Sequence, residues 1–253
     1  MRVPPSLVTQ REFRKAHGDR ISAELDLNKL GYPIINHRDA INWVLDGQHR
    51  IYALKQFGFS DKDTIDCEVY EDLTDAEMAD IFLGRDERKP IPLYDKFHVA
   101  VTAGRKREQD IQRAVESNGQ TISRNKNEGG ISAVGALSAV YERSGDVVIG
   151  QVVRTINLGF GGDPMGFDRA VIEGLGLVFN RYNGRTNEKQ LGARLADLRQ
   201  GARELLRKAE AIRARTGNQK KQCVAAAVVD IYNKGLGPRA ADRLPSWWKE
   251  SAQ

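Results

Sequence analysis

Hydrophobic and polar positions follow two patterns along the chain, and the first pattern mixes strands with helices. Short apolar segments bounded by turn residues predict strands at Pro33–Asn36 and Ile41–Leu45, joined as a hairpin by the polar turn 37–39. Alternation at 64–70 predicts a third, half-buried strand with Ile65, Cys67 and Val69 on its inner face. Apolar residues at helical spacing predict helices over Arg14–Leu30, Gln48–Gly58 and Asp75–Leu83.

The last of these helices has the clearest start signal. Thr74 and Glu77 have the spacing of a capping box, in which each side chain binds the backbone N–H of the other residue. Leu73 and Met78 are placed to form the accompanying hydrophobic staple. The sequence therefore predicts a helix that begins at Asp75.

From Leu93 onward the helical pattern dominates. The stretch Lys89–Pro92, "KPIP", interrupts regular structure, so we place a domain boundary there, between residues 1–92 and 93–253. The fold class is α+β: an N-terminal α/β domain followed by a mostly α-helical domain. Helices are predicted over Tyr94–Gly104, Glu108–Asn118, Ser132–Arg143, Val147–Leu158, Asp168–Arg181 and Gln222–Asn233.

The segment Glu188–Lys221 has the most regular pattern of all. Apolar residues recur every three or four positions, which predicts one long helix with a buried stripe. This stripe and the nearby run Val224–Val229 exceed what one small helical domain is expected to cover, so the sequence also predicts a homo-oligomer. The stripe consists of Leu191, Leu195, Leu198, Ala202, Leu205, Ala209 and Ile212.

Charge changes the interpretation of this helix. The chain has a formal net charge of +5, and the whole basic excess lies in Glu188–Lys221. A row of cations can neutralise the phosphates of DNA, whereas a solvated helix face explains the same charges without a ligand. The residues that would contact nucleic acid are Arg194, Arg199, Arg203, Arg207 and Lys208.

The most informative short stretch is "VLDGQHR", where a predicted strand ends and a helix begins. Helix N-termini attract phosphate, Gly47 allows close approach of the backbone, and Arg50 can bind two phosphate oxygens. His49 can transfer a proton, Asp46 can hold a metal ion, and Gln48 is the residue at which the helix begins. The alternative is purely structural: a common Asp-Gly turn, a helix cap and local ion pairs.

The segment "GYPIINHRDAINWVLDGQHRIYALKQFG", followed by "IDCEVYEDLTDAEMADIFLGRDERKPI", resembles the DGQHR subgroup of the ParB/sulfiredoxin superfamily. The resemblance covers about residues 1–92. It implies a ParB-like fold and a polyphosphate held at the turn by Gly47, Gln48, His49 and Arg50, with Asp46, His49 and Arg50 as catalytic residues. Relatives bind CTP or ATP or act as DNases, but Gln48 replaces the cysteine that sulfiredoxin chemistry requires.

The second nucleotide motif of ParB proteins corresponds to "GRDERK" at Gly84–Lys89, in which the usual asparagine is missing. Here the resemblance assigns Asp86 and Glu87, with Asp46, to a Mg²⁺ ion and Arg88 to the nucleotide. The implied function is a DNA-associated protein with a nucleotide-binding or nuclease-like site, possessing Mg²⁺-dependent nucleotide hydrolase or DNA nuclease activity. The alternative is a non-catalytic DNA-binding or regulatory module.

Location and context follow from the remaining features. The chain shows no signal peptide and no apolar run of the roughly 18 residues that a membrane span needs, and its two cysteines favour free thiols. The later segments, such as "DIQRAVESNG" and "LPSWW", resemble ParB-like proteins of actinobacterial phages and prophages. The expected location is therefore the cytoplasm of a bacterial host. Trp247 and Trp248 are predicted to pin the tail onto the helical domain, with base stacking as the alternative.

Overall fold

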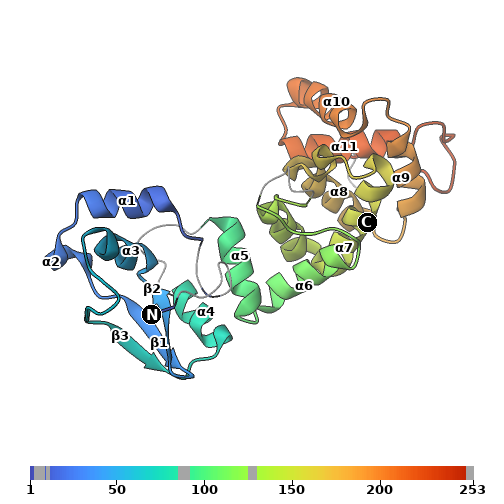
Figure 1. Ribbon diagram of the computed structural model, residues 1–253. Helices are drawn as coiled ribbons and strands as arrows, with labels where there is room; N and C mark the ends of the chain where they lie inside the picture. Colours follow the sequence, from blue (N-terminus) through green and yellow to red (C-terminus); the bar gives the residue numbers. More distant parts are fainter. Residues whose placement is uncertain (3–8, 10–11, 85–91, 125–129, 249–253) are drawn as a thin grey trace. The chain divides into compact units, whose positions relative to one another are not determined.

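The computed structural model describes residues 1–2, 9, 12–84, 92–124 and 130–248, and the fold is α+β (Figure 1). The chain divides into two compact units, Met1–Glu108 and Gln109–Gln253. The first unit contains a three-stranded sheet with helices, whereas the described elements of the second are helical. None of the helices in these described ranges combines the length and apolarity needed to cross a bilayer.

The sheet of the first unit has the strand order β2-β1-β3. β1 (Ile34–Arg38) and β2 (Ile41–Asp46) form the predicted hairpin, whose turn residues Asp39 and Ala40 both have positive φ. β3 (Glu68–Glu71) pairs with β1 in parallel. All three predicted strands are present, although their ends differ from the predicted ones, and β2 ends at the candidate turn.

The inner face of β3 differs from the prediction. Val69, predicted to point inward, is 52% exposed, while Tyr70 packs against a core cluster of Ile34, Leu45 and Met78. The regular strand begins only at Glu68, and its parallel register against β1 determines which side chains meet the core. Ile65 and Cys67 are half-buried as predicted, with Asp66 exposed between them, so the predicted inner face is wrong at Val69, within the regular strand.

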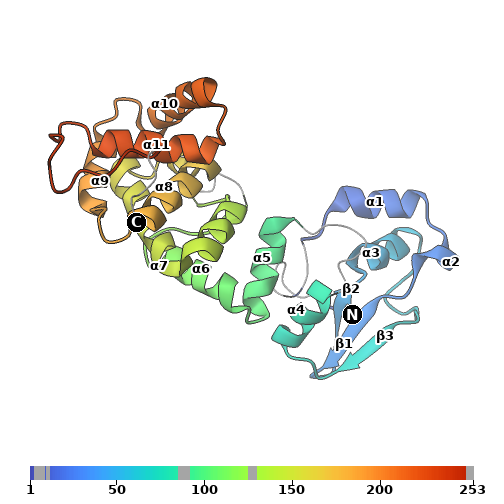
Figure 2. The same ribbon diagram turned by 180° about the vertical axis from the view of Figure 1, so that it is seen from behind.

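The helices of the first unit are α1 (Lys15–Ala23), α2 (Leu27–Leu30), α3 (Gln48–Gln56), α4 (Asp75–Gly84) and α5 (Leu93–Thr102). α3 lies between α1 and the strands in both views (Figures 1 and 2). The single helix predicted over Arg14–Leu30 is wrong. It ends at Ala23, and α2 starts afresh because the Asp26 carboxylate accepts the backbone N–H of Asn28 at 3.0 Å.

The capping box of α4 is confirmed. The backbone N–H of Thr74 donates to Glu77 Oε2 at 2.8 Å, and the N–H of Glu77 donates to Thr74 Oγ1 at 3.3 Å. Hydrogen bonds from the Thr74 backbone and hydroxyl hold the pKa of the Glu77 carboxyl below its usual value. Leu73 and Met78, the predicted staple, both belong to the core cluster.

The second unit is built from α6 (Lys106–Glu116, which begins before the boundary), α7 (Val134–Phe160), the short 3₁₀ helix η2 (Pro164–Phe167), α8 (Arg169–Arg181), α9 (Glu188–Ala196), α10 (Gly201–Thr216) and α11 (Lys220–Tyr232). α7 is interrupted at Gly145, whose φ of 76° and ψ of −175° are not helical. This break agrees with the two helices predicted on either side of it. Asp168 caps α8 by accepting the N–H of Ala170 at 2.9 Å.

The single long helix predicted over Glu188–Lys221 is wrong, because the segment forms two helices, α9 and α10, and α11 begins at Lys220, close to the start of the separately predicted helix Gln222–Asn233. After α9 the chain forms short turns, and Gly201, the first residue of α10, has a φ of +51°. α10 ends where Gly217 adopts a left-handed conformation, and α11 follows. Most of the apolar stripe is nevertheless buried: Leu191, Leu195, Ala202, Leu205 and Ala209 are each 0% exposed, while Leu198 and Ile212 are half-buried.

This burial also bears on the predicted homo-oligomer. Val224, Val228 and Val229 of the neighbouring apolar run are likewise 0% exposed within the second unit. Most of the apolar surface that motivated the prediction is thus covered by the same chain. Self-association stays a prediction that needs another surface.

The unit boundary lies after Glu108, whereas the sequence placed a domain boundary at 92; most of the "KPIP" stretch lies outside the described residues. α5 packs on α4, and its Phe97 and Val99 are 3% and 0% exposed. α5 therefore completes the core of the first unit.

At the other end of the chain, Arg181 Nη1 donates to the Trp247 carbonyl at 2.6 Å, and Trp247 contacts Tyr182 edge-on, which confirms Trp247 as a packing residue.

Candidate functional site

The junction of β2 and α3 forms a sharp strand-to-helix turn. β2 ends at Asp46, Gly47 adopts a left-handed conformation with φ of 104°, and α3 begins at Gln48. The first intrahelical bond runs from Ile51 N–H to the Gly47 carbonyl at 2.9 Å. Since glycine is the residue before the helix, no side chain at that position caps the helix N-terminus.

Gly47 is required here for a second reason, its close approach to Pro33. A Cβ atom placed on Gly47 would lie 3.0 Å from the Cβ and 3.1 Å from the Cα of Pro33. Pro33 is buried and immediately precedes β1. The turn is therefore packed against the start of the central strand, which fixes the direction in which α3 leaves the sheet.

Asp46 and Arg50 form a small polar network around the turn. Asp46 Oδ1 accepts the backbone N–H of Gly47 at 2.8 Å, and Asp46 Oδ2 lies 3.4 Å from Arg50 Nη2. Arg50 Nη1 donates to the Tyr32 carbonyl at 2.9 Å. The guanidinium thus stays beside the turn, where an incoming phosphate would compete with the Asp46 carboxylate for it.

His49 is packed under the start of α1. It is only 9% exposed, and its Nε2 atom accepts the backbone N–H of Arg14 at 3.1 Å. The Phe13 ring stacks on the imidazole at 4.9 Å, and the His17 ring meets its edge at 4.8 Å. Because Nε2 is an acceptor in this bond, the arrangement suits a positioning residue that docks α1 on α3 better than a proton shuttle.

Sequence reasoning missed Phe13, Arg14 and His17 as neighbours of the turn. Nothing in the local pattern around residue 13 points to residue 49, because the contact depends on how α1 folds back over α3. Gln48, proposed for nucleotide binding, is 8% exposed and faces mostly the protein interior.

The described residues do not assemble a magnesium site at this turn. In the described ranges, no group of three or more His, Cys, Asp or Glu side chains is placed to hold a metal ion. Of the predicted ligands, Asp46 already binds a backbone N–H and Arg50. Asp86 and Glu87, together with the predicted nucleotide ligand Arg88, lie outside the described residues.

The predicted nucleic-acid residues are distributed over three segments of the second unit. Arg194 belongs to α9 and is half-buried, Arg199 is exposed between α9 and α10, and the others lie on α10. Lys208 Nζ lies 3.5 Å from Glu204 Oε1, so part of its charge is compensated. Arg203 and Arg207 are exposed and one helical turn apart, which places them on one face of α10.

These features define an α+β protein with a glycine-dependent strand-to-helix turn and a separate helical unit that carries exposed arginines. The chain belongs to the family described as "Family of unknown function (DUF6551)", whose model matches residues 3–245. No match was found among curated proteins or among solved structures. The resemblance to ParB proteins therefore remains a prediction.

Proposed function

We propose that this chain is a DNA-associated protein whose first unit binds phosphate, from a nucleotide or from DNA, at the turn Asp46–Arg50. The observation that carries the proposal is the geometry of that turn. No side chain at Gly47 caps the start of α3, and the positive end of a helix dipole attracts an anion. Arg50 lies one helical turn further on and is held at the same place by Asp46 and the Tyr32 carbonyl.

The non-catalytic form of this function is the better supported one. His49 is buried, stacked and engaged through Nε2, so it supports the fold of the turn rather than proton transfer. Asp46 faces Arg50 rather than a set of carboxylates. We therefore propose a binding or regulatory module that retains the turn, and no hydrolytic step is assigned to these residues.

The exposed arginines of the second unit support the choice of DNA as partner. Arg203 and Arg207 project from one face of α10, and Arg199 precedes this helix. Arginines that each neutralise one phosphate make binding steeply dependent on salt. DNA held along α10 and a phosphate held at the turn are two separate contacts, and each can be tested by its own substitutions.

The first prediction tests the turn through a matched pair of arginines in the first unit. Arg50 and Arg38 have side chains 28% and 27% exposed, and each binds one backbone carbonyl and at least one aspartate, but Arg38 lies at the opposite end of the hairpin. We expect Arg50→Ala to weaken binding of the phosphate ligand about tenfold or more, because a charge-assisted hydrogen bond is lost. Arg38→Ala should cost similar stability and leave binding unchanged.

Fluorescence anisotropy with labelled duplex DNA, and calorimetric titration with each nucleoside triphosphate, identify the source of the phosphate. Loss of triphosphate binding alone in Arg50→Ala assigns the turn to a nucleotide, and loss of DNA binding alone assigns it to the DNA backbone. Undiminished binding of every ligand by a folded Arg50→Ala protein would refute the proposed site. Charge reversal at Arg199, Arg203 and Arg207 should flatten the salt dependence of DNA binding in the same assay.

A further inference from the structure

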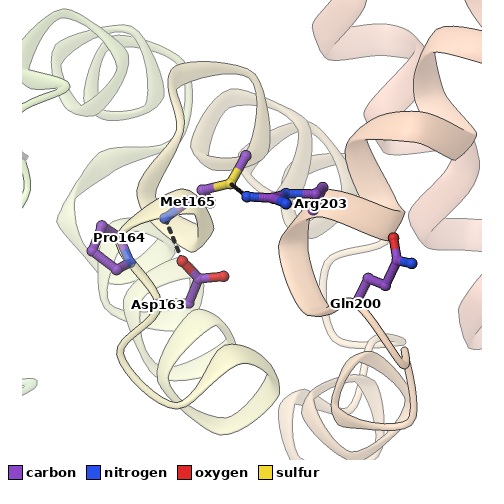
Figure 3. Close-up of a pocket in the computed structure, with 5 residues that line it drawn as sticks. All are labelled: Asp163, Pro164, Met165, Gln200 and Arg203. Atoms are coloured by element: carbon purple, nitrogen blue, oxygen red, sulfur yellow. Dashed lines mark hydrogen bonds between the residues drawn. The ribbon is translucent and has the colours of Figure 1, made fainter.

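The second unit contains a pocket that is not part of the turn site. It lies between η2 and the start of α10, has a volume of about 570 Å³, and falls in the size range of small-molecule sites. Figure 3 shows the residues that line it: Asp163, Pro164, Met165, Gln200 and Arg203. Of these residues, the sequence analysis pointed only to Arg203, through its charge.

Two opposite charges line this pocket without forming an ion pair with each other. Asp163 Oδ1 accepts the backbone N–H of Met165 at 2.9 Å, and Arg203 Nη2 reaches only the Met165 sulfur, at 3.9 Å. In Figure 3 the carboxylate turns toward the Met165 nitrogen and the guanidinium toward its sulfur. Within the described part of the chain, neither side chain forms a salt bridge. A ligand that carries donors and acceptors side by side would satisfy both.

We propose that this pocket binds a guanine base. The N1–H and 2-amino groups of guanine are adjacent donors that suit the Asp163 carboxylate, and its O6 and N7 atoms are acceptors that suit the Arg203 guanidinium. Gln200 adds an amide that can donate or accept, while Pro164 and Met165 offer apolar surface to the ring. The choice of a nucleobase rests on the proposed association with nucleic acid.

A free amino acid is the competing occupant, since its ammonium and carboxylate groups would also match Asp163 and Arg203. The surroundings favour the nucleobase. Arg199 and Arg207 are exposed on either side of Arg203 in the sequence, where they can take the phosphates that flank a base. An amino acid would leave these two arginines without a role.

The methionine methyl groups offer a direct test, because the chain has only three methionines. Met165 lines the pocket, whereas Met78 lies in the core of the first unit. We would label the methionine methyls with ¹³C in the full chain and titrate guanosine, inosine and adenosine 5′-monophosphates by NMR. The Met165 signal should respond to the guanine nucleotide at about tenfold lower concentration than to the inosine nucleotide, which lacks the 2-amino donor.

Substitutions connect the response to the two charges. Asp163→Asn keeps an acceptor for the Met165 N–H but removes the carboxylate, so the preference for guanine over hypoxanthine should disappear. Arg203→Ala should weaken binding of the guanine nucleotide, whereas Arg213→Ala is the control, because Arg213 lies outside the pocket on the same helix and pairs with Glu210. Retention of the preference in folded Asp163→Asn would overturn the assignment.

Other outcomes separate this inference from the proposed function. A Met165 signal that ignores all three nucleotides, or that responds equally to them or to glycine, overturns the guanine site. Arg50-dependent DNA binding would then still stand. Conversely, if Met165 responds to the guanine nucleotide but the chain binds no DNA, the guanine site is supported and the proposed association with DNA is rejected.

Discussion

The position of Gly47 imposes two constraints, a positive φ and close contact with Pro33, and only glycine satisfies both. Its φ is +104°, and a Cβ atom would press on Pro33 at 3.0 Å. A side chain at such a φ costs about 1–2 kcal/mol by itself. The close approach to Pro33 adds a packing conflict, for which roughly another 1–3 kcal/mol is typical.

Gly58 provides the matched comparison for a prediction at this position. It has nearly the same φ, +109°, but nothing lies within 4 Å of the place that a Cβ atom would occupy, so only the backbone strain applies. We expect Gly47→Ala to lower the free energy of unfolding by about 1–3 kcal/mol more than Gly58→Ala. Urea denaturation of both variants measures this difference, and equal losses would show that the turn can move away from Pro33.

At the residue scale, the sequence predicted the strand, the glycine turn and the helix start at Gln48 correctly, because each depends on neighbouring residues. It could not predict that His49 lies under Phe13, since this contact joins residues 36 positions apart through the docking of α1. The Arg50 bond to the Tyr32 carbonyl is missed for the same reason. The roles proposed for these side chains therefore depended on contacts that no local pattern encodes.

Among the elements, α8 and α11 are joined by a buried carboxylate. The Glu173 side chain is 5% exposed and lies 2.7 Å from Arg169 Nε and 3.0 Å from Lys221 Nζ. Burial acts to raise the pKa of the Glu173 carboxyl, but the hydrogen bonds and charges of Arg169 and Lys221 outweigh it and leave the pKa below its ordinary value. The ionised form therefore stabilises the contact between the two helices.

This pKa predicts how stability depends on pH. A folded-state pKa below the unfolded value means that the stabilisation is complete above the ordinary glutamate pKa of about 4.3 and is lost as the pH falls through the folded-state pKa. We expect Glu173→Gln to lower the free energy of unfolding by about 1–3 kcal/mol at pH 7, with a smaller difference from the natural chain near pH 3.

Denaturation of both proteins at the two pH values tests this expectation, with Glu210→Gln as the control. Glu210 is 57% exposed and pairs with Arg213 at 3.4 Å, so its loss should cost only about 0–1 kcal/mol. A Glu173→Gln effect that is the same at pH 7 and pH 3 would mean that shape, not charge, is responsible.

The elements themselves were predictable to the extent that local signals decide them. The start of α4 follows from Thr74 and Glu77, which are three residues apart. The break after Ala196 had no comparable signal, because the apolar stripe continues at helical spacing through Leu198 and Ala202. The chain turns there so that α9 and α10 each pack on α11, and only the tertiary structure contains that information.

For the whole molecule, the division into two units was predicted, but its position depends on one helix. "KPIP" suggests a boundary before α5, whereas α5 packs on α4 and the contacts divide the chain after Glu108. Phe97 and Val99 account for the difference, since both are buried in the first unit. Their apolar spacing predicts a helix but not the partner that covers it.

Two fragments distinguish these boundaries. Residues 103–253 keep all of α6 and leave α5 out, so we expect this fragment to unfold cooperatively and to bind little of the dye anilinonaphthalene sulfonate. Residues 93–253 retain α5 without α4, which exposes Phe97 and Val99, so this fragment should bind the dye strongly and associate in light scattering. The intact chain serves as the reference for both measurements. Equal dye binding and a single monomeric species for both fragments would instead place α5 outside the core of the first unit and support a boundary at 92.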